Sequence, residues 1–234
     1  MRSRFREPEL MDDPALDPVE HDKALRGLAR MNRISGTYNS LIEPIVRLSR
    51  TVNSRTLSVL DIATGSGDVP IAICKAGASL GVKLNVSGCD ISDTAISRAS
   101  RNAAEAGAEI EFFKWNALEE EIPRRFDVIV NSLFLHHLDE TNTVRLLSKM
   151  RESATRLVIV NDLERTTFSL ATVFAASRLF STSPVVHFDG PASVRAAYSM
   201  DELAQLAARA GLTGFSLKRH FPCRMLLEYR QVQT

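Results

Sequence analysis

The sequence predicts an α/β fold: a doubly wound, mostly parallel sheet with an antiparallel hairpin at its C-terminal end. Short apolar runs typical of buried strands alternate with segments of helical spacing through the middle of the chain. This alternation favours parallel strands joined by right-handed helical crossovers, with helices on both faces of the sheet. The last two strand-like runs are separated only by residues 222–224, and such close spacing demands an antiparallel hairpin.

Seven strands are expected. Five lie in the alternating part, at residues 57–62, 84–90, 110–114, 126–131 and 157–161, and the hairpin strands lie at 215–221 and 225–229. Helices are expected at 69–80, at 93–106, through Val144, Leu147 and Met150, and at 200–210. Gly107 and Gly211 follow two of these helices in the position of a C-terminal cap, and Ser199 opens the last one with a capping-box pattern.

The N-terminal part differs from the rest in composition. Residues 1–19 are charged and contain three prolines, which suits a surface arm or a disordered lead-in. Helical spacing begins at His21 and returns in residues 41–48, with a break at residues 35–37. We therefore expect an N-terminal arm with cap helices over residues 1–55, followed by one domain over residues 56–234.

The composition indicates which classes of binding partner and which cellular compartment to expect. The chain has 29 Lys and Arg against 28 Asp and Glu, a net charge of +1, so nothing indicates a nucleic-acid partner. There is no apolar signal-peptide core and no run near the roughly 20 apolar residues of a membrane span. The three cysteines lie far apart, as buried free thiols would. We expect a cytoplasmic protein without stable membrane insertion, either a monomer or a homodimer.

The most informative segment is the glycine-rich turn after the first strand. Gly65 and Gly67 let the backbone bend sharply and approach a ligand. The helix that follows directs its N-terminal N–H groups into the same space. The third glycine of a dinucleotide fingerprint would fall at Pro70, and the carboxylate of Asp61 would repel a pyrophosphate. The turn therefore favours a ligand with an amino group, and Asp90, which ends the second strand, could bind ribose hydroxyls.

The segment LDIATGSG at residues 60–67 resembles the first motif of the class I S-adenosylmethionine-dependent methyltransferases, and Asp90 resembles their ribose-binding acid. Asn116 and Ala117 match the adenine-contacting position, although that family more often has aspartate before the alanine. Residues 126–138 are similar to the family's fourth strand and the loop bordering its methyl-transfer site. The resemblance covers about residues 56–231 and implies a seven-stranded, Rossmann-like sheet with S-adenosyl-L-methionine as the cofactor.

The resemblance implies a set of cofactor contacts, with Asp61, Gly65 and Gly67 on the methionine part. The expected cofactor-binding residues are Asp61, Ala63, Thr64, Gly65, Gly67, Asp90, Ile91, Asn116, Ala117 and Asn131. Asp90 has the alternative of capping the helix after it, and Asn116 that of a turn residue. Two other classes of protein stay open: a nicotinamide-dependent oxidoreductase on the same sheet, and a non-catalytic protein that binds the cofactor.

His136 and His137 are the candidate catalytic residues, because they follow the fourth strand at the edge of the sheet where ligands bind. Adjacent residues point in different directions, so we expect at most one of them to face the methyl group. Either could instead cap the next helix or satisfy local hydrogen bonds. Asn161, Asp162 and Glu164 follow the fifth strand at the same edge, where Asp162 could be a helix cap or a substrate contact. No metal site is expected, because no ligand spacing is apparent.

Candidate acceptor contacts are Tyr38, His187 and Arg195. Residues 31–38 resemble the aromatic-bearing cap of quinone-biosynthesis methyltransferases, although Tyr38 could simply pack. His187 and Arg195 lie in a stretch that has the glycine and proline of an ordered loop. Residues 168–180 are apolar almost all round, and could form a lid, a dimer contact or, the reading we favour, a core helix.

These features lead to one functional expectation. The chain is expected to methylate oxygen or carbon of a small apolar or aromatic acceptor, such as a quinone-like or polyketide-like molecule. An RNA acceptor is disfavoured by the balanced charge. The Asn-Pro-Pro-aromatic signature of amino-methyltransferases is absent, since residues 131–134 read Asn-Ser-Leu-Phe.

Overall fold

The computed structural model describes residues 3–13, 15–34, 37–52 and 56–231. The strands are β1 (Leu57–Ile62), β2 (Leu84–Asp90), β3 (Ile110–Lys114), β4 (Phe126–Ser132), β5 (Ala154–Leu163), β6 (Ser216–His220) and β7 (Arg224–Arg230). The helices are α1 (Pro18–Ile34), α2 (Thr37–Ser49), α3 (Asp68–Ser79), α4 (Asp93–Ala106), α5 (Glu140–Ser153), α6 (Thr167–Phe180), α7 (Pro184–Ala196) and α8 (Met200–Arg209), with short 3₁₀ turns η1 (Leu10–Asp12) and η2 (Leu135–His137).

The predicted architecture is confirmed. The seven strands lie in the order β3-β2-β1-β4-β5-β7-β6, parallel from β3 to β5 and antiparallel in β5-β7-β6. The chain reverses direction from β1, first toward β3 and then toward β5, so the carboxyl ends of β1 and β4 form a topological switch point. Ligands of open α/β sheets bind at such a point.

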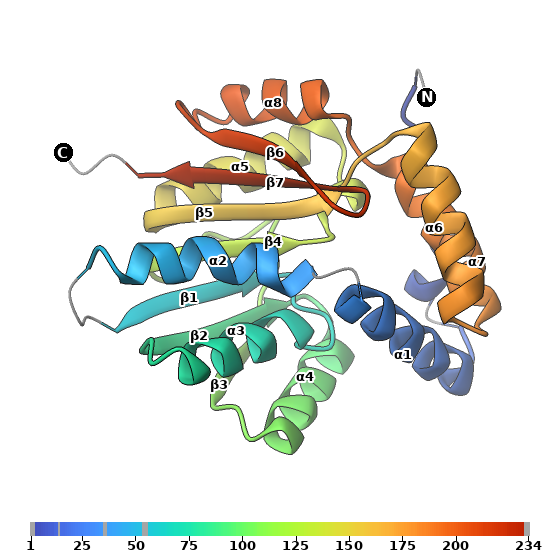
Figure 1. Ribbon diagram of the computed structural model, residues 1–234, viewed down its shortest axis with the longest axis horizontal. Helices are drawn as coiled ribbons and strands as arrows, with labels where there is room; N and C mark the ends of the chain where they lie inside the picture. The colour runs from blue at the N-terminus through green and yellow to red at the C-terminus, as the bar shows by residue number, and fades with distance from the viewer. Residues whose placement is uncertain (1–2, 14, 35–36, 53–55, 232–234) are drawn as a thin grey trace.

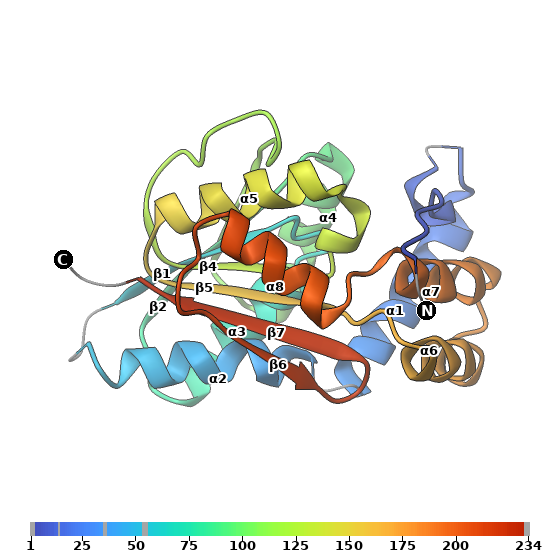
Figure 2. The ribbon, with the colours of Figure 1, turned by 90° about the horizontal axis from the view of Figure 1, so that it is seen from above.

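Helices cover both faces of the sheet (Figures 1 and 2). Figure 2 shows α5 and α8 on one face and α2 and α3 on the other. Leu60 and Ile129 are fully buried in the core on the α5–α8 side, and Val59 and Val128 in the core on the α2–α3 side. The alternation of inward-facing residues along β1 and β4 therefore supplies both cores.

A third group of helices stands at the carboxyl ends of the strands. α1, α6 and α7 pack against one another and form a cap there, at the right of Figure 1. Ala24 on α1 and Val185 and Val186 on α7 are buried where those two helices meet. The break expected at residues 35–37 separates α1 from α2, but residues 35 and 36 lie outside the described residues.

Two segments of the cap differ from the sequence expectation. Residues 184–196 form helix α7 rather than a loop; Pro184 takes the first helical position, where its missing N–H costs nothing. The internal Gly190 and Pro191 concealed the helix. Helix α6 is not a core helix, because Phe168, Phe174 and Leu179 are 65%, 49% and 76% exposed. It packs on α7 through small residues: a Cβ added to Gly190 would lie 3.1 Å from Val173 Cγ1 and 3.7 Å from Ser177 Cβ.

The N-terminal arm, residues 3–13, is docked rather than a disordered lead-in. Phe5 N–H donates to Arg195 O at 3.1 Å. The Asp189 carboxylate accepts hydrogen bonds from Leu10 N–H and Met11 N–H at 2.8 and 3.1 Å. The arm therefore lies along α7, and this placement brings Glu9 to the carboxyl edge of the sheet.

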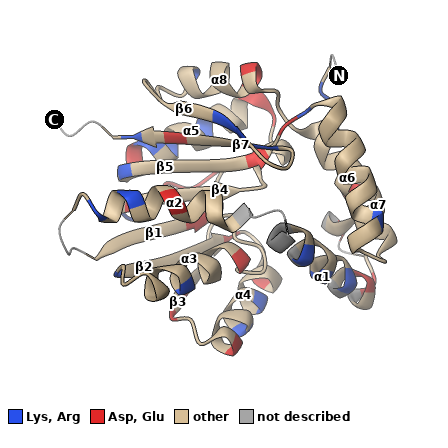
Figure 3. Cartoon of the chain, in the orientation of Figure 1, with Lys and Arg blue, Asp and Glu red and all other residues tan. Residues whose placement is uncertain are grey.

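Charges are mixed over the molecule. Figure 3 shows Lys and Arg interspersed with Asp and Glu on the same helices, among them α4, α5 and α8. None of the described helices is both long and apolar enough to cross a membrane.

Candidate functional site

The glycine-rich turn joins the end of β1 to α3, and its two glycines serve different purposes. Gly65 has a φ of +54°, and a Cβ added there would meet no atom within 4 Å, so its bare face borders open space. Gly67 has a φ of +81°, and an added Cβ would lie 3.0 Å from Ala99 Cβ and 3.2 Å from Phe112 Cζ. Gly65 permits the bend and the approach of a ligand, whereas Gly67 also permits close packing against α4. Ala63, with a φ of +56°, takes the same left-handed conformation without being glycine.

Asp61 lies beneath this turn, beside the side chain of Thr64. Its side chain is buried, and its Oδ1 has no hydrogen-bond partner among the described residues. Burial raises the pKa of Asp61 to about 7; the Thr64 hydroxyl opposes this shift, and the charges of Asp90 and Asp68 reinforce it. Because an unpaired buried carboxylate is unfavourable, the position favours a ligand that brings a cation beside it.

Asp90 holds the turn from the neighbouring strand. Its carboxylate accepts Gly65 N–H at 2.9 Å and Ser92 N–H at 3.0 Å. The side chain that caps α4 is Ser92, which accepts Ala95 N–H at 3.3 Å. The helix-cap alternative for Asp90 is therefore wrong, and its oxygens keep lone pairs for a further donor. Ile91, 59% exposed, follows it at the rim.

Asn116 and Ala117 lie close to Asp90, because Trp115 N–H donates to Asp90 O at 2.9 Å. Asn116 Oδ1 accepts Leu118 N–H at 3.0 Å, which is the local turn that the sequence left as the alternative role. The amide Nδ2 is not needed for this turn. A role in adenine binding thus stays a prediction for this pair.

Asn131 ties β4 to the end of β1. The fully buried Asn131 Nδ2 donates to Ile62 O at 2.9 Å, while its Oδ1 has no partner among the described residues. The unpaired Oδ1 of Asn131 and that of Asp61 both belong to strands that meet at the switch point. Thr64, also expected to bind the cofactor, is buried in the turn beside them.

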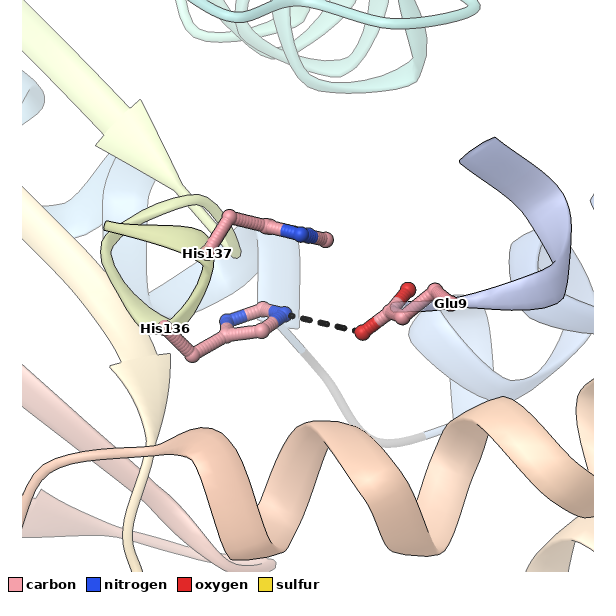
Figure 4. Close-up of side chains that lie close together, drawn as sticks. All are labelled: Glu9, His136 and His137. Atoms are coloured by element: carbon pink, nitrogen blue, oxygen red, sulfur yellow. Dashed lines mark ion pairs between the residues drawn. The ribbon is translucent and has the colours of Figure 1, made fainter. Parts of the chain in front are cut away.

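His136 and His137 form the turn η2 after β4. His136 Nδ1 lies 2.7 Å from Asp162 Oδ1, and His136 N–H donates to Asp162 Oδ2 at 3.3 Å. His136 Nε2 lies 3.7 Å from Glu9 Oε1. Figure 4 shows both imidazoles projecting from η2 toward Glu9. We expected the two rings to point in different directions. They instead lie next to each other, with their centroids 4.3 Å apart.

The two histidines have opposite charge preferences. Burial disfavours the charged form of His136, but the carboxylates of Asp162 and Glu9 outweigh it and raise the pKa of His136. Burial and the charge of His136 lower the pKa of His137 to about 3. His137 is therefore neutral at physiological pH, and His136 is held between two carboxylates.

The polar residues after β5 have distinct partners. Asp162 bonds His136 and also accepts Leu163 N–H at 2.7 Å, so it is not a helix cap. Asn161 Nδ2 donates to Ser40 Oγ at 2.7 Å, and Glu164 forms an ion pair with Arg219. Glu9 was not among the predicted site residues, because no local pattern shows that residue 9 contacts residue 136.

The candidate acceptor residues are divided between two places. His187 and Arg195 line a pocket of about 470 Å³ on the cap, together with Phe5, Glu7, Phe174 and Phe188. His187 Nε2 lies 2.8 Å from Ser181 O, and Arg195 Nη1 donates to Glu7 Oε1 at 3.0 Å. Among the described residues that line this pocket, none comes from the glycine-rich turn or from η2. Tyr38 lies in α2 and is half-buried.

Comparison with known proteins shows which family of domains has a similar sequence in this part of the chain. Residues 59–155 match the family model of a methyltransferase domain. Over residues 59–155 the chain therefore carries a methyltransferase domain. The matched segment contains the turn, Asp90, Asn116, Asn131 and both histidines.

Curated relatives match the same methyltransferase domain. A release factor glutamine methyltransferase of Flavobacterium psychrophilum is 33% identical over 94 residues, which are 39% of this chain and 32% of that protein. A ribosomal protein L11 methyltransferase of Lactobacillus johnsonii is 40% identical over 80 residues, 34% of this chain and 24% of that protein. The aligned part of the chain thus spans about a third or less of the length of these relatives.

Solved structures share the methyltransferase fold over nearly the whole chain. The plantazolicin methyltransferase BpumL, bound to a desmethylPZN analog and SAH, has a TM-score of 0.67 at 14% identity, covering 93% of this chain and 91% of that one. The magnesium protoporphyrin IX methyltransferase of Synechocystis PCC 6803, with bound SAH, has a TM-score of 0.58 at 18% identity, covering 94% and 90%. These likenesses confirm the predicted fold.

The residues of the turn fit S-adenosylmethionine, the cofactor of this class of domain. The unpaired Oδ1 of Asp61 suits the cofactor's ammonium group, and Gly65 leaves its face open for the amino acid part. The Asp90 carboxylate is fixed where it can accept ribose hydroxyls. A pyrophosphate would be repelled by Asp61, so the structure agrees with the sequence in disfavouring a dinucleotide.

Proposed function

We propose that this protein transfers a methyl group from S-adenosylmethionine to an oxygen or carbon of a small apolar or aromatic acceptor, for instance a quinone-like or polyketide-like molecule. The observation that carries the proposal is the His136–Asp162 pair, buried at the ends of β4 and β5, on the same sheet edge as the glycine-rich turn. A polar pair at the switch point, beneath a helical cap, suits an acceptor enclosed between sheet and cap.

Different residues of the site would bind different parts of S-adenosylmethionine. Asp61, Gly65 and Gly67 would hold the methionine part, Asp90 the ribose, and Asn116 with Ala117 the adenine. Ala63, Thr64, Ile91 and Asn131 would complete the surroundings. When bound, S-adenosylmethionine supplies an electrophilic methyl group on its sulfonium.

His136 is the residue best placed to act on the acceptor. Asp162 fixes the orientation of its ring through Nδ1, so Nε2, which faces Glu9, is the nitrogen left to orient an acceptor hydroxyl. His137, kept neutral, would line the same space. Tyr38 on α2 and His187 and Arg195 on the cap remain candidate acceptor contacts.

The cofactor part of the proposal is tested by calorimetry with S-adenosylmethionine and NADH in separate titrations. We expect S-adenosylmethionine to bind the wild type, and Asp90→Ala to weaken its affinity at least tenfold. Asp93→Ala is the matched control, because Asp93 is exposed and pairs with Lys114. Binding of NADH with no response to S-adenosylmethionine would overturn the assignment.

The acceptor part is tested by turnover. Phenols, hydroxyquinones and enols of increasing size are incubated with S-adenosylmethionine, and formation of S-adenosylhomocysteine is followed. We expect turnover with apolar ring acceptors and a loss of about 10²–10⁴-fold in kcat for His136→Ala. If His136→Ala and His137→Ala both keep full turnover, neither histidine acts on the acceptor.

Protein side chains form a second candidate class of acceptor, favoured by the names of the curated relatives. The Asn-Ser-Leu-Phe segment at residues 131–134 departs from the Asn-Pro-Pro-aromatic signature, which weighs against it. Incubation with a release factor and with ribosomal protein L11 discriminates the two classes, since methylation of either protein would favour the second.

A further inference from the structure

A cluster of three metal-type donors lies at the junction of the N-terminal arm and η2. It consists of the Glu9 carboxylate and the imidazoles of His136 and His137, whose donor atoms all lie within 4.8 Å of one another. Figure 4 shows the three side chains converging on one small space, with Glu9 arriving from the arm and the histidines from the end of β4. No local pattern predicts this cluster, because 127 residues separate Glu9 from His136.

We propose that Glu9, His136 and His137 bind one divalent transition-metal ion. Two imidazoles and one carboxylate are a donor set used for catalytic Zn²⁺ and for non-haem Fe²⁺. Donors at about 2.0–2.2 Å from an ion lie roughly 3–3.5 Å from one another. The distance from Glu9 Oε1 to His136 Nε2 is 3.7 Å. Shifts of a few tenths of an ångström in these side chains would therefore bring both atoms to the separation of two ligands of one ion.

The outer contacts of the donors support the assignment. Metal-bound histidines characteristically donate their other ring N–H to a carboxylate, and His136 Nδ1 lies 2.7 Å from Asp162 Oδ1. This contact favours the tautomer in which Nε2, the nitrogen facing Glu9, carries the lone pair. Ser193 Oγ donates to Glu9 Oε1 and holds the third donor from α7.

The charges around the donors are mixed, because the carboxylates of Glu9 and Asp162 and the guanidinium groups of Arg4, Arg6 and Arg224 all act on the two imidazoles. The carboxylates of Glu9 and Asp162 supply two negative charges, and His136 between them is nearly inaccessible. Arg4 Nη2 donates to His136 O at 2.7 Å and its Nη1 donates to Tyr198 Oη at 2.8 Å, so this guanidinium is fixed beside the donors and opposes a cation there.

Three protein donors leave one position of a tetrahedral ion open. An acceptor oxygen that bound there would lose its proton more readily, because a metal ion stabilises the oxyanion. In that case the ion, rather than His136 Nε2, would act on the acceptor. This role rests on the proposed function, whereas metal binding itself does not.

The test is a metal titration of the untagged, chelator-treated full chain, with Co²⁺ followed by its visible absorption and Zn²⁺ by calorimetry. We expect one equivalent of each to bind, with the absorption of a low-symmetry Co²⁺ site. Glu9→Gln and His137→Ala should each weaken binding more than tenfold, and Asp162→Asn by about 10–100-fold. Glu9→Asp, which keeps the carboxylate, should retain part of the affinity.

Two matched variants control for nonspecific effects. Asp13→Asn removes an exposed carboxylate from the same arm, and His21→Ala removes an imidazole from α1; both should bind as the wild type does. The proposal is overturned if the wild type binds neither ion, or if Glu9→Gln and His137→Ala bind as tightly as the wild type. Calorimetry with S-adenosylhomocysteine in the same samples reports separately on the cofactor site and on folding, so the two proposals can fail independently.

Discussion

At the scale of single residues, the site depends on a few side chains whose environment differs from that of an ordinary surface group. Asp61 and Asn131 each leave a buried oxygen without a partner among the described residues. Sequence spacing located both residues, because they end or follow apolar runs. The pairing of His136 with Asp162 and Glu9 could not be read from spacing, because it depends on how β5 and the arm are placed around η2.

The raised pKa of Asp61 predicts a pH-dependent affinity for S-adenosylmethionine. Below its pKa of about 7 the carboxyl of the free protein is neutral, and a neutral carboxyl attracts an ammonium group weakly. Between pH 5 and 7 the cofactor stays cationic, so its affinity should rise with pH, by up to about tenfold per unit, with release of a proton on binding. Calorimetry in buffers of different ionisation enthalpy measures both effects.

Asp61→Asn is the control for this prediction, because asparagine keeps the shape but does not titrate in this range. The variant should bind the cofactor weakly at every pH and without proton release. An unchanged pH profile in Asp61→Asn would assign the titration to another group.

The two glycines of the turn should respond differently to alanine. Gly67→Ala introduces a left-handed alanine and a Cβ 3.0 Å from that of Ala99, so we expect a loss of about 2–4 kcal/mol in the free energy of unfolding. Gly65→Ala meets no neighbour and should cost about 1–2 kcal/mol, while lowering cofactor affinity. Urea unfolding and calorimetry separate these effects. Equal destabilisation of the two variants would contradict the packing role given to Gly67.

At the scale of elements, the sequence predicted the helices and strands whose local apolar pattern is regular. The strands β1, β2 and β3 and the helix α4 begin and end where the apolar pattern placed them. The helix α7 was missed because Gly190 and Pro191 interrupt its pattern, while tertiary contacts with α1 and α6 stabilise it. The exposure of α6 was missed for a related reason, since Val173 and Ser177 make its close contact with Gly190 of α7, while Phe168 and Phe174 are exposed.

The docking of the arm on α7 depends on Asp189. Its carboxylate accepts the N–H groups of Leu10 and Met11, and hydrogen bonds to a charged group contribute about 1.5–3 kcal/mol. Asp189→Ala should therefore speed hydrogen exchange at these two amides about tenfold or more. Cofactor affinity should not change, because Asp189 is not part of the turn. Unchanged exchange would show that other contacts hold the arm.

At the scale of the whole molecule, sheet topology brings the site together. The reversal of strand order places the turn after β1 next to the end of β4, although some 70 residues separate them in the chain. Alternation of strands and helices predicted this arrangement, because parallel strands end at the same edge. What covers that edge depends on long-range contacts of α1, α6, α7 and the arm, which no local pattern encodes.

Helix α2 belongs to the core of the domain and not to the cap formed by α1, α6 and α7. Leu41 and Ile45 on α2 are 0% and 1% exposed and pack with Val59, Val128 and Ile159 of the sheet. Leu41→Ala should lower the free energy of unfolding by about 2–5 kcal/mol, as expected for truncation of a core leucine. Leu10→Ala, on the arm and 41% exposed, is the matched control and should change it by less than about 1 kcal/mol. Urea denaturation measures both variants; if Leu41→Ala were as mild as Leu10→Ala, α2 would belong to the cap, and the sheet would fold without it.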